Sequence, residues 1–110
     1  MANLNSYFKS SYTNNTWSNL VTVTNKSMIL CINATNTTGN SITCEIRITD
    51  NTSTEKFRLL PPTELTSYNN ITNSDKIVIP AGYKINVKAS APGVTFMVNL
   101  AENIWYNYYN

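Results

Sequence analysis

The chain has 110 residues, which predicts a single domain covering residues 1–110. Only 13% of its residues are charged, the net charge is +2, and histidine is absent. The chain therefore lacks a strongly basic nucleic-acid-binding surface, the commonest zinc ligand and the side chain most often used as a general base near neutral pH. Because 42% of the residues are hydrophobic, a disordered chain is also excluded. We expect a folded protein that is not an enzyme, needs no cofactor or metal and binds no nucleic acid.

Asparagine, threonine and serine dominate the composition, with 18, 15 and 10 residues. Such a composition generates Asn-x-Ser/Thr sequons by itself, so we interpret the sequons as a result of composition and not as glycosylation sites. Residues 1–6 have neither the basic nor the apolar segment of a secretory signal. No apolar run is long enough to span a membrane. We expect a protein made in the cytosol, with no membrane partner.

In chain order, residues 1–16 are polar with three interspersed aromatic residues, and they form either an N-terminal arm or an edge strand. Beyond them, short apolar or alternating segments are separated by turn residues, which is the pattern of β-strands and not of helices. Pro61 and Pro62 are predicted to end the strand before them, and residues 63–75 to form a long polar connection. The predicted strands cover residues 17–25, 28–34, 42–49, 56–60, 76–79, 84–89 and 94–100, and an aromatic segment, 104–109, follows.

Several predicted strands alternate apolar and polar residues, so one face of each should be buried and the other wet. About seven or eight short strands with turns roughly every eight to twelve residues are typical of two packed antiparallel sheets. The predicted fold class is all-β, an antiparallel β-sandwich or jelly roll. The residues expected to point inward are Ile42, Cys44, Ile46, Ile48, Ile85, Val87, Val94, Phe96, Val98 and Leu100.

The two cysteines, Cys31 and Cys44, flank the polar stretch 33–41. A hairpin symmetric about that stretch would place them opposite each other, where a cross-strand disulfide could form. The other interpretation is two free thiols in a reducing cell, and we favour it. Without a CxxC motif, neither a metal site nor a redox pair is expected.

Charged residues show no catalytic spacing. Glu45 and Glu55 could approach each other, but Glu45 lies on the wet face of its strand, so solvated charges are the favoured interpretation. The oxygen-rich segment 50–55 is interpreted as a turn, because it lacks the glycine and alternating acids of a calcium loop. Three lysines lie near one another in the sequence: Lys76, Lys84 and Lys88. They either form a patch that binds an acidic partner or keep a strand edge soluble, and we favour the second interpretation.

The C-terminal segment is unusually aromatic, with four Trp or Tyr residues between positions 105 and 109. Such a segment could be a closing strand, a sugar-stacking platform or a protein interface, and we favour the interface because exposed rings are costly without a partner. Aromatic residues near the N-terminus would join it. The predicted partner interface consists of Tyr7, Phe8, Tyr12, Trp105, Tyr106, Tyr108 and Tyr109.

The block 76–91 contains an apolar strand, a Pro-Ala-Gly turn, a second apolar strand and a Lys-Ala-Ser motif. In this block the chain resembles small β-sandwich virion structural proteins of tailed bacteriophages, of the head-decoration or tail-accessory type. Segments 1–3, 12–17, 20–23 and 28–50 are similar to that family as well, so the resemblance covers most of the chain in order. The Tyr-rich C-terminus and the two cysteines depart from the family pattern.

The resemblance implies a structural protein without catalytic residues. It implies first a capsid decoration (cement) protein that binds the outside of the shell, stabilises it and often forms a homotrimer. The implied partners are the major capsid protein and further copies of the chain, and the implied location is the virion, assembled in the host cytoplasm. A tail, neck or fibre-associated virion protein is the alternative. A carbohydrate-binding module or adhesin that uses the terminal aromatic residues is a second alternative.

Overall fold

The protein is a β-sandwich. The computed structural model describes residues 3–10 and 15–104, and these residues contain strands and turns but no helix. This confirms the all-β prediction, with more strands than the sequence indicated. The strands are β1 (Asn3–Ser10), β2 (Ser18–Thr22), β3 (Ser27–Asn36), β4 (Ile42–Thr49), β5 (Glu55–Leu65), β6 (Asn70–Asn73), β7 (Ile77–Ile79), β8 (Lys84–Ala89) and β9 (Val94–Glu102).

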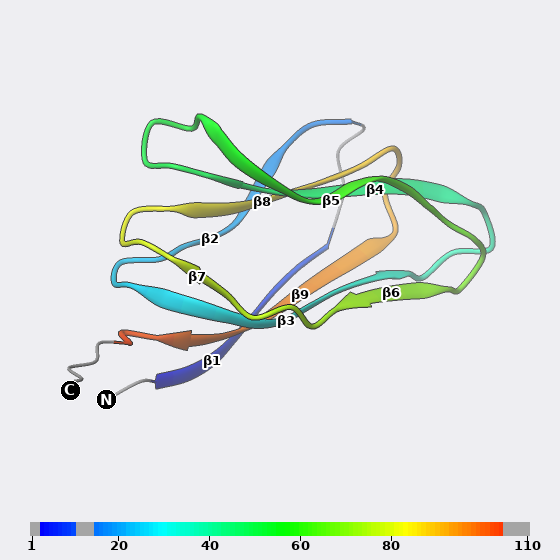
Figure 1. The fold of residues 1–110 in the computed structure, drawn as a ribbon. Helices are drawn as coiled ribbons and strands as arrows, with labels where there is room; N and C mark the ends of the chain where they lie inside the picture. Colours follow the sequence, from blue (N-terminus) through cyan, green and yellow to red (C-terminus); the bar gives the residue numbers. More distant parts are fainter. Residues whose placement is uncertain (1–2, 11–14, 105–110) are drawn as a thin grey trace.

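The strands form two antiparallel sheets, one above the other (Figure 1). Sheet A has the order β1-β9-β3-β6, with β7 also paired to β3, and sheet B has the order β2-β8-β4-β5. The pairing is nested: β1 pairs with β9, β2 with β8, β3 with β6 and β7, and β4 with β5. This is a long hairpin folded over on itself, the arrangement of a jelly roll.

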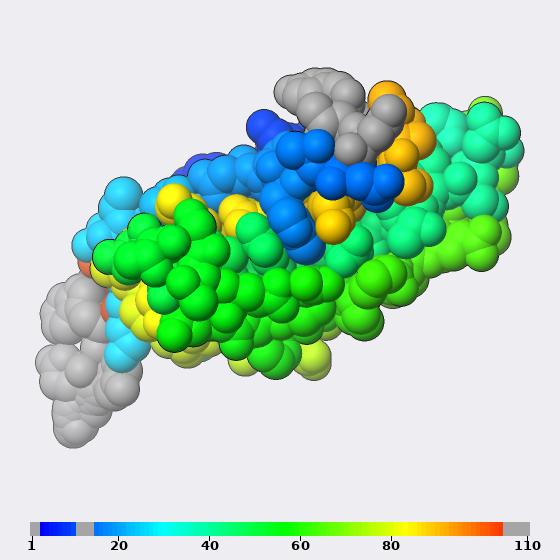
Figure 2. Space-filling model, turned by 90° about the horizontal axis from the view of Figure 1, so that it is seen from above, coloured from blue at the N-terminus to red at the C-terminus, as the bar shows by residue number. Residues whose placement is uncertain are grey.

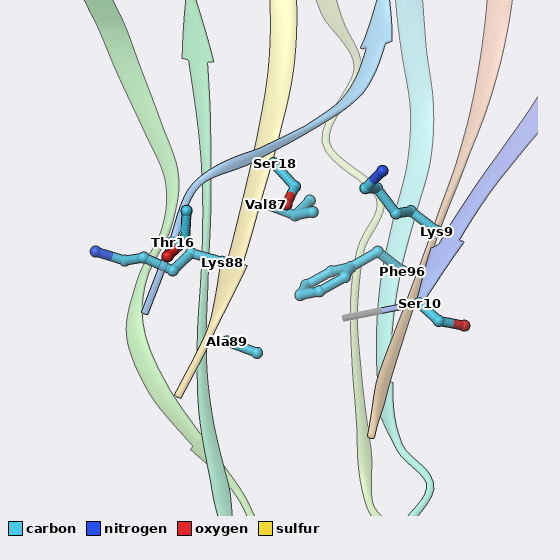
Figure 3. Close-up of a pocket in the computed structure, with 8 residues that line it drawn as sticks. All are labelled: Lys9, Ser10, Thr16, Ser18, Val87, Lys88, Ala89 and Phe96. Atoms are coloured by element: carbon cyan, nitrogen blue, oxygen red, sulfur yellow. The ribbon is translucent and has the colours of Figure 1, made fainter. Parts of the chain in front are cut away.

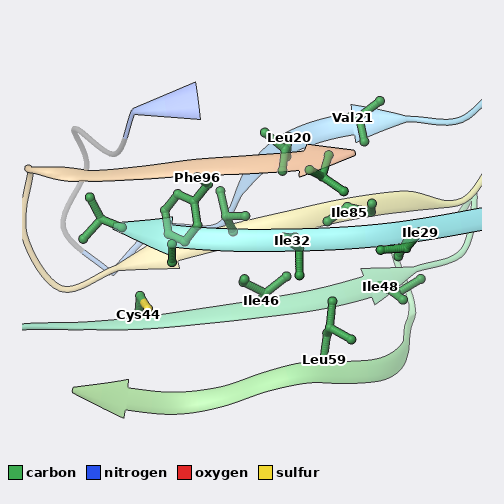
Figure 4. Packing of buried hydrophobic residues seen from close by; sticks show 14 of the residues in the cluster. Leu20, Val21, Ile29, Ile32, Cys44, Ile46, Ile48, Leu59, Ile85 and Phe96 are labelled. Atoms are coloured by element: carbon green, nitrogen blue, oxygen red, sulfur yellow. The ribbon is translucent and has the colours of Figure 1, made fainter. Parts of the chain in front are cut away.

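The core lies between the two sheets and follows the period of two that a pleated strand imposes. All ten residues predicted to point inward are at most 3% exposed, which confirms the registers of β4, β8 and β9. Figure 4 shows Ile32 from sheet A facing Ile46 from sheet B, with Phe96 nearby. Phe96 is fully buried, and burying a side chain of that size stabilises a fold by roughly 1.5–3 kcal/mol.

The prediction that Pro61 and Pro62 end a strand is wrong, because β5 continues through them to Leu65. The strand is an edge strand of sheet B, so proline nitrogens on its free side have no hydrogen bond to lose. The register with β4 also shifts between Cys44 and Ile46, where two prolines oppose one residue of β4. The segment 63–75, predicted to be one long connection, instead contains the end of β5 and all of β6.

The hairpin that would have placed Cys31 opposite Cys44 does not form, and the favoured interpretation of two free thiols is confirmed. Cys31 lies in β3 of sheet A and Cys44 in β4 of sheet B, so the chain crosses from one sheet to the other between them. Both thiols are free; Cys31 is half-buried and Cys44 is buried. Burial, with a smaller contribution from the neighbouring Glu45 carboxylate, raises the pKa of the Cys44 thiol to about 11. Such a thiol is protonated and unreactive at neutral pH.

A buried asparagine, Asn36, organises the crossing from sheet A to sheet B. Its side-chain amide donates hydrogen bonds to the carbonyl oxygens of Asn40 and Leu65 at 2.6 and 3.0 Å. Its side-chain oxygen accepts hydrogen bonds from the backbone N–H and the hydroxyl of Thr38. Because an unpaired buried amide is costly, these bonds hold the end of β3 and the following loop in one arrangement.

Two predicted turns are present, and the conformation and hydrogen bonds of each explain its residue types. Pro80 to Tyr83 is a β-turn whose closing bond, from Tyr83 N to Pro80 O, is 3.3 Å long. Gly82 has φ +88° at the position where such a turn needs a positive φ. In the segment 50–54, the Asp50 carboxylate accepts hydrogen bonds from the backbone N–H groups of Thr52 and Thr54. This confirms that the segment is a turn.

Candidate interaction surface

The carboxylates of Glu45 and Glu55, which the sequence suggested could approach each other, both contact the guanidinium of Arg58. Arg58 Nη1 lies 2.7 Å from Glu45 Oε1, and Arg58 Nη2 lies 2.7 Å from Glu55 Oε1. The hydrogen bonds from Arg58 lower the pKa of Glu55, whereas a catalytic acid needs a raised pKa. Among the described residues, no group of three or more side chains could hold a metal ion. The same residues include no helix that could serve as a membrane span.

Charged side chains cover the outer face of sheet B and surround one aromatic ring. Trp17 lies just before β2, and its ring centroid is 4.2 Å from Arg47 Cζ, 4.6 Å from Lys88 Nζ and 5.2 Å from Arg58 Cζ. Figure 2 looks onto this side of the molecule, with β2 in blue, β8 in yellow and β5 in green. We call this set the Trp17 cluster: Trp17, Glu45, Arg47, Glu55, Arg58 and Lys88.

The charges of the Trp17 cluster are paired with one another. Glu45 contacts Arg58 and also Lys88, whose Nζ is 3.3 Å from Glu45 Oε2. Glu55 contacts Arg58 and, at 3.8 Å, Arg47. The sequence predicted charged residues on this face but not the ring between them, because nothing in the pattern around Trp17 indicates which sheet face it covers. The charged groups of the cluster bind one another and the ring, so the cluster is not an open binding site.

The three lysines do not share one role. β8 lies between β2 and β4, so Lys84 and Lys88 do not protect a sheet edge, and the favoured interpretation of them is wrong. Lys88 belongs to the Trp17 cluster. Lys76 instead donates hydrogen bonds to the carbonyl oxygens of Leu30 and Ser74, in the gap between β6 and β7 along β3.

The outer face of sheet A is different, because no charged residue lies on it among the residues that the strand registers place there. One row across four strands is entirely apolar: Leu4, Ala101, Met28 and Val78 are successive register partners. In another row, Phe8 pairs with Met97. Leu4 is 74%, Phe8 66% and Val78 47% exposed, Met28 and Met97 are partly buried, and Ala101 is buried. Exposed apolar side chains on an uncharged sheet face make this face the candidate interaction surface.

The predicted interface residues fall on different parts of the molecule. Phe8 is exposed on the outer face of sheet A. Tyr7 points to the other side of β1, and its hydroxyl donates to the Glu102 carboxylate at 2.7–2.8 Å, which raises the Tyr7 pKa. The other five predicted residues lie outside the described part of the chain; they are Tyr12, Trp105, Tyr106, Tyr108 and Tyr109.

Two cavities lined by the described residues are small. One, of about 10 Å³, lies on the β1 side between Lys9 and Phe96 of sheet A and Val87 and Lys88 of sheet B (Figure 3). Another, of about 80 Å³, lies on the β5 and β6 side and is lined mainly by isoleucine and leucine. Small-molecule sites usually enclose about 300–1,000 Å³. The outer face of sheet A is therefore a better candidate for recognition than either cavity.

No protein-family model matches the chain, and no curated protein matches it. Among solved structures, the chain is similar to one from infectious bursal disease virus Gx strain, with 12% identity, a TM-score of 0.48, and coverage of 93% of this chain and 32% of that one. It is also similar to a pentameric capsid protein from metagenomic phage sequences, with 14% identity, a TM-score of 0.43, and coverage of 87% and 60%. The chain thus spans about a third of the first protein and less than two thirds of the second. Since both TM-scores are below 0.5, we base no function on these likenesses.

Proposed function

We propose that this protein is a non-enzymatic structural component of a phage virion, a capsid decoration protein that attaches to the outer shell through the outer face of sheet A. The observation that carries the proposal is that face, which is uncharged and exposes Leu4, Phe8 and Val78. Burying a few such side chains against a shell contributes several kcal/mol per copy, and many copies act together.

Two further features support this role. The nested strand pairing is that of a jelly roll, a fold that viral capsid and lectin domains share. The family resemblance described above also implies a decoration protein, with the major capsid protein as the partner and a homotrimer as the association state. Within the described residues, Trp17 offers no open sugar platform, because Arg47 lies over its ring at 4.2 Å. We therefore favour a protein partner over a carbohydrate.

The test is binding of the purified protein to capsids that lack it, measured by co-sedimentation and by cryo-electron microscopy of the particles. Val78→Asp places a charge on the outer face of sheet A at a solvent-exposed position, and we expect it to abolish binding without unfolding the protein. Thr22→Asp is the matched control, because Thr22 is exposed on the outer face of sheet B. Equal binding by both variants would exclude sheet A as the attachment surface.

A second variant tests the aromatic C-terminus. We propose that Trp105, Tyr106, Tyr108 and Tyr109 add to the attachment surface, so a chain that ends at Ile104 should bind particles more weakly. The backbone N–H of Ile104 donates to Lys26 O at 2.8 Å, and β9 is complete at Glu102, so this chain should still fold. Full occupancy of capsids by the shortened chain would remove the aromatic residues from the proposal. An occupancy near a dozen copies per particle would favour a neck or tail position instead.

A further inference from the structure

We propose that two copies of the chain pair edge to edge through β1, antiparallel and about a two-fold axis at Ser6, so that their two sheets A become one continuous sheet. The first observation is that β1 is the end strand of sheet A. One side of it pairs with β9 along its whole length, from Asn3 to Ser10. Within the described residues, no strand pairs with its other side.

The second observation is a comparison of the sheet edges. Proteins block unwanted pairing with short edge strands, bulges, prolines and charges. On the opposite edge of sheet A, β6 and β7 have only four and three residues. In sheet B, β2 has five residues and an irregular register, and β5 carries Pro61, Pro62, register shifts and several charges.

β1 has none of the features that protect the other edges. It is eight residues long, contains no proline and only one charged residue, Lys9, and keeps an unbroken register with β9. It also exposes two large apolar side chains, Leu4 and Phe8. A long regular edge of this kind is a template for another strand.

The third observation is that β1 is complementary to itself. In an antiparallel pair with Ser6 opposite Ser6, Leu4 of one copy faces Phe8 of the other, and this contact occurs twice. Lys9 faces Asn3, so no like charges are opposed. A two-fold axis at Tyr7 would place Leu4 opposite Ser10, and an axis between two residues would mix the faces of the sheet, so neither buries both apolar residues.

A second copy is the occupant that this symmetry selects, because an isologous contact requires a surface that complements itself. The axis is perpendicular to the sheet, so the uncharged outer faces of both copies end on the same side. A pair would therefore present a doubled surface of the kind proposed above for attachment to the shell. The pairing itself does not depend on that attachment, and it differs from the homotrimer that the family resemblance implies.

The first experiment measures the mass of the full chain by light scattering and sedimentation, up to about 1 mM protein because a single strand pair is a small interface. We expect twice the monomer mass. The double variant Leu4→Ser, Phe8→Ser should be monomeric with an unchanged circular dichroism spectrum. Val78→Ser, on the same sheet face but away from β1, should remain dimeric. A monomeric or trimeric wild type, or a dimeric double variant, would overturn the proposal.

The second experiment tests the axis. In a Cys31→Ser background, Ser6→Cys should form a covalent dimer under mild oxidation, since directly opposed residues have Cβ atoms within disulfide reach. Ser10→Cys lies on the same face four residues further along β1 and should remain monomeric on a denaturing gel. Cross-linking of Ser10→Cys but not Ser6→Cys would contradict the register. Because neither readout uses capsids, failure here and failure of shell attachment are distinguishable.

Discussion

The two outer faces of the sandwich cover the same core but differ in the side chains that they present to solvent. On sheet B, every charged member of the Trp17 cluster contacts an opposite charge or the ring. On sheet A, one row of apolar residues crosses four strands, and Leu4 and Phe8 are exposed among the described residues. The charges of one face are paired within the chain, whereas the other face leaves apolar side chains in water, where we propose that a partner covers them.

This difference separates stability from recognition. Removing a member of the Trp17 cluster from the face of sheet B should weaken the fold, because it breaks contacts within the chain. Removing one from the outer face of sheet A should leave the fold intact and weaken association. Three sets of substitutions test that separation, starting with the core that both faces share.

The largest effect is expected in the core. Phe96 is 0% exposed and Ile46 2%, so Phe96→Ala or Ile46→Ala should lower the free energy of unfolding by roughly 2–5 kcal/mol. Thr95→Ala and Thr43→Ala remove residues that are only partly buried on the outer faces, and each should cost less than about 0.5 kcal/mol. Chemical denaturation gives both values. If Thr95→Ala lowered the free energy of unfolding as much as Phe96→Ala, the side chains of the outer faces would contribute to stability as much as the core does.

The next effect distinguishes the two faces directly. Trp17→Ala removes a half-buried ring and three cation contacts, so we expect a loss of about 1–3 kcal/mol in unfolding free energy. Phe8→Ala removes an equally apolar but 66% exposed ring, and its cost should stay within about 0.5 kcal/mol. Both are measured by urea denaturation in dilute solution, where association does not contribute. If the two costs were equal, the distinction between the faces would fail.

Local patterns predicted the parts of the molecule that local forces determine. The alternation around Ile46, Val87 and Val98 is a property of single strands, and it correctly predicted which side chains are buried. The turn at Gly82 was predictable for the same reason, since a Pro-x-Gly sequence satisfies its own dihedral requirements.

Pairing between distant segments was not predictable in this way. Pro61 and Pro62 normally end a strand, and only the position of β5 at a sheet edge makes them acceptable. Cys31 and Cys44 are close in sequence, but the chain crosses from sheet A to sheet B between them. The hydrogen bond from Asn36 to Leu65, which helps to hold this crossing, joins residues far apart in the sequence. Trp17 joins three cations from β4, β5 and β8, and no spacing within residues 15–22 reveals those partners.

The smallest effect is expected from pH and is confined to sheet B. Hydrogen bonds and charge from Arg58, with a contribution from Arg47, lower the pKa of Glu55 from its ordinary value of 4.5. A carboxylate whose pKa is lower in the folded state stabilises the fold above the pKa of the unfolded state, and this contribution disappears as the pH falls through the folded value. The wild type should therefore lose stability below about pH 4.5 that Glu55→Gln does not lose.

The magnitude should be modest, because partly exposed ion pairs contribute at most about 1 kcal/mol. Urea midpoints of both proteins between pH 6 and pH 3 give the difference. Glu64→Gln is the matched control, since it changes the net charge equally, lies on the same strand, and is outside the Trp17 cluster. If Glu64→Gln flattened the pH profile as much as Glu55→Gln, the acid sensitivity would follow net charge and not the contacts of Arg58. If neither did, the ion pairs around Trp17 would contribute nothing measurable, and the completeness of this face would rest on the ring and the strand packing alone.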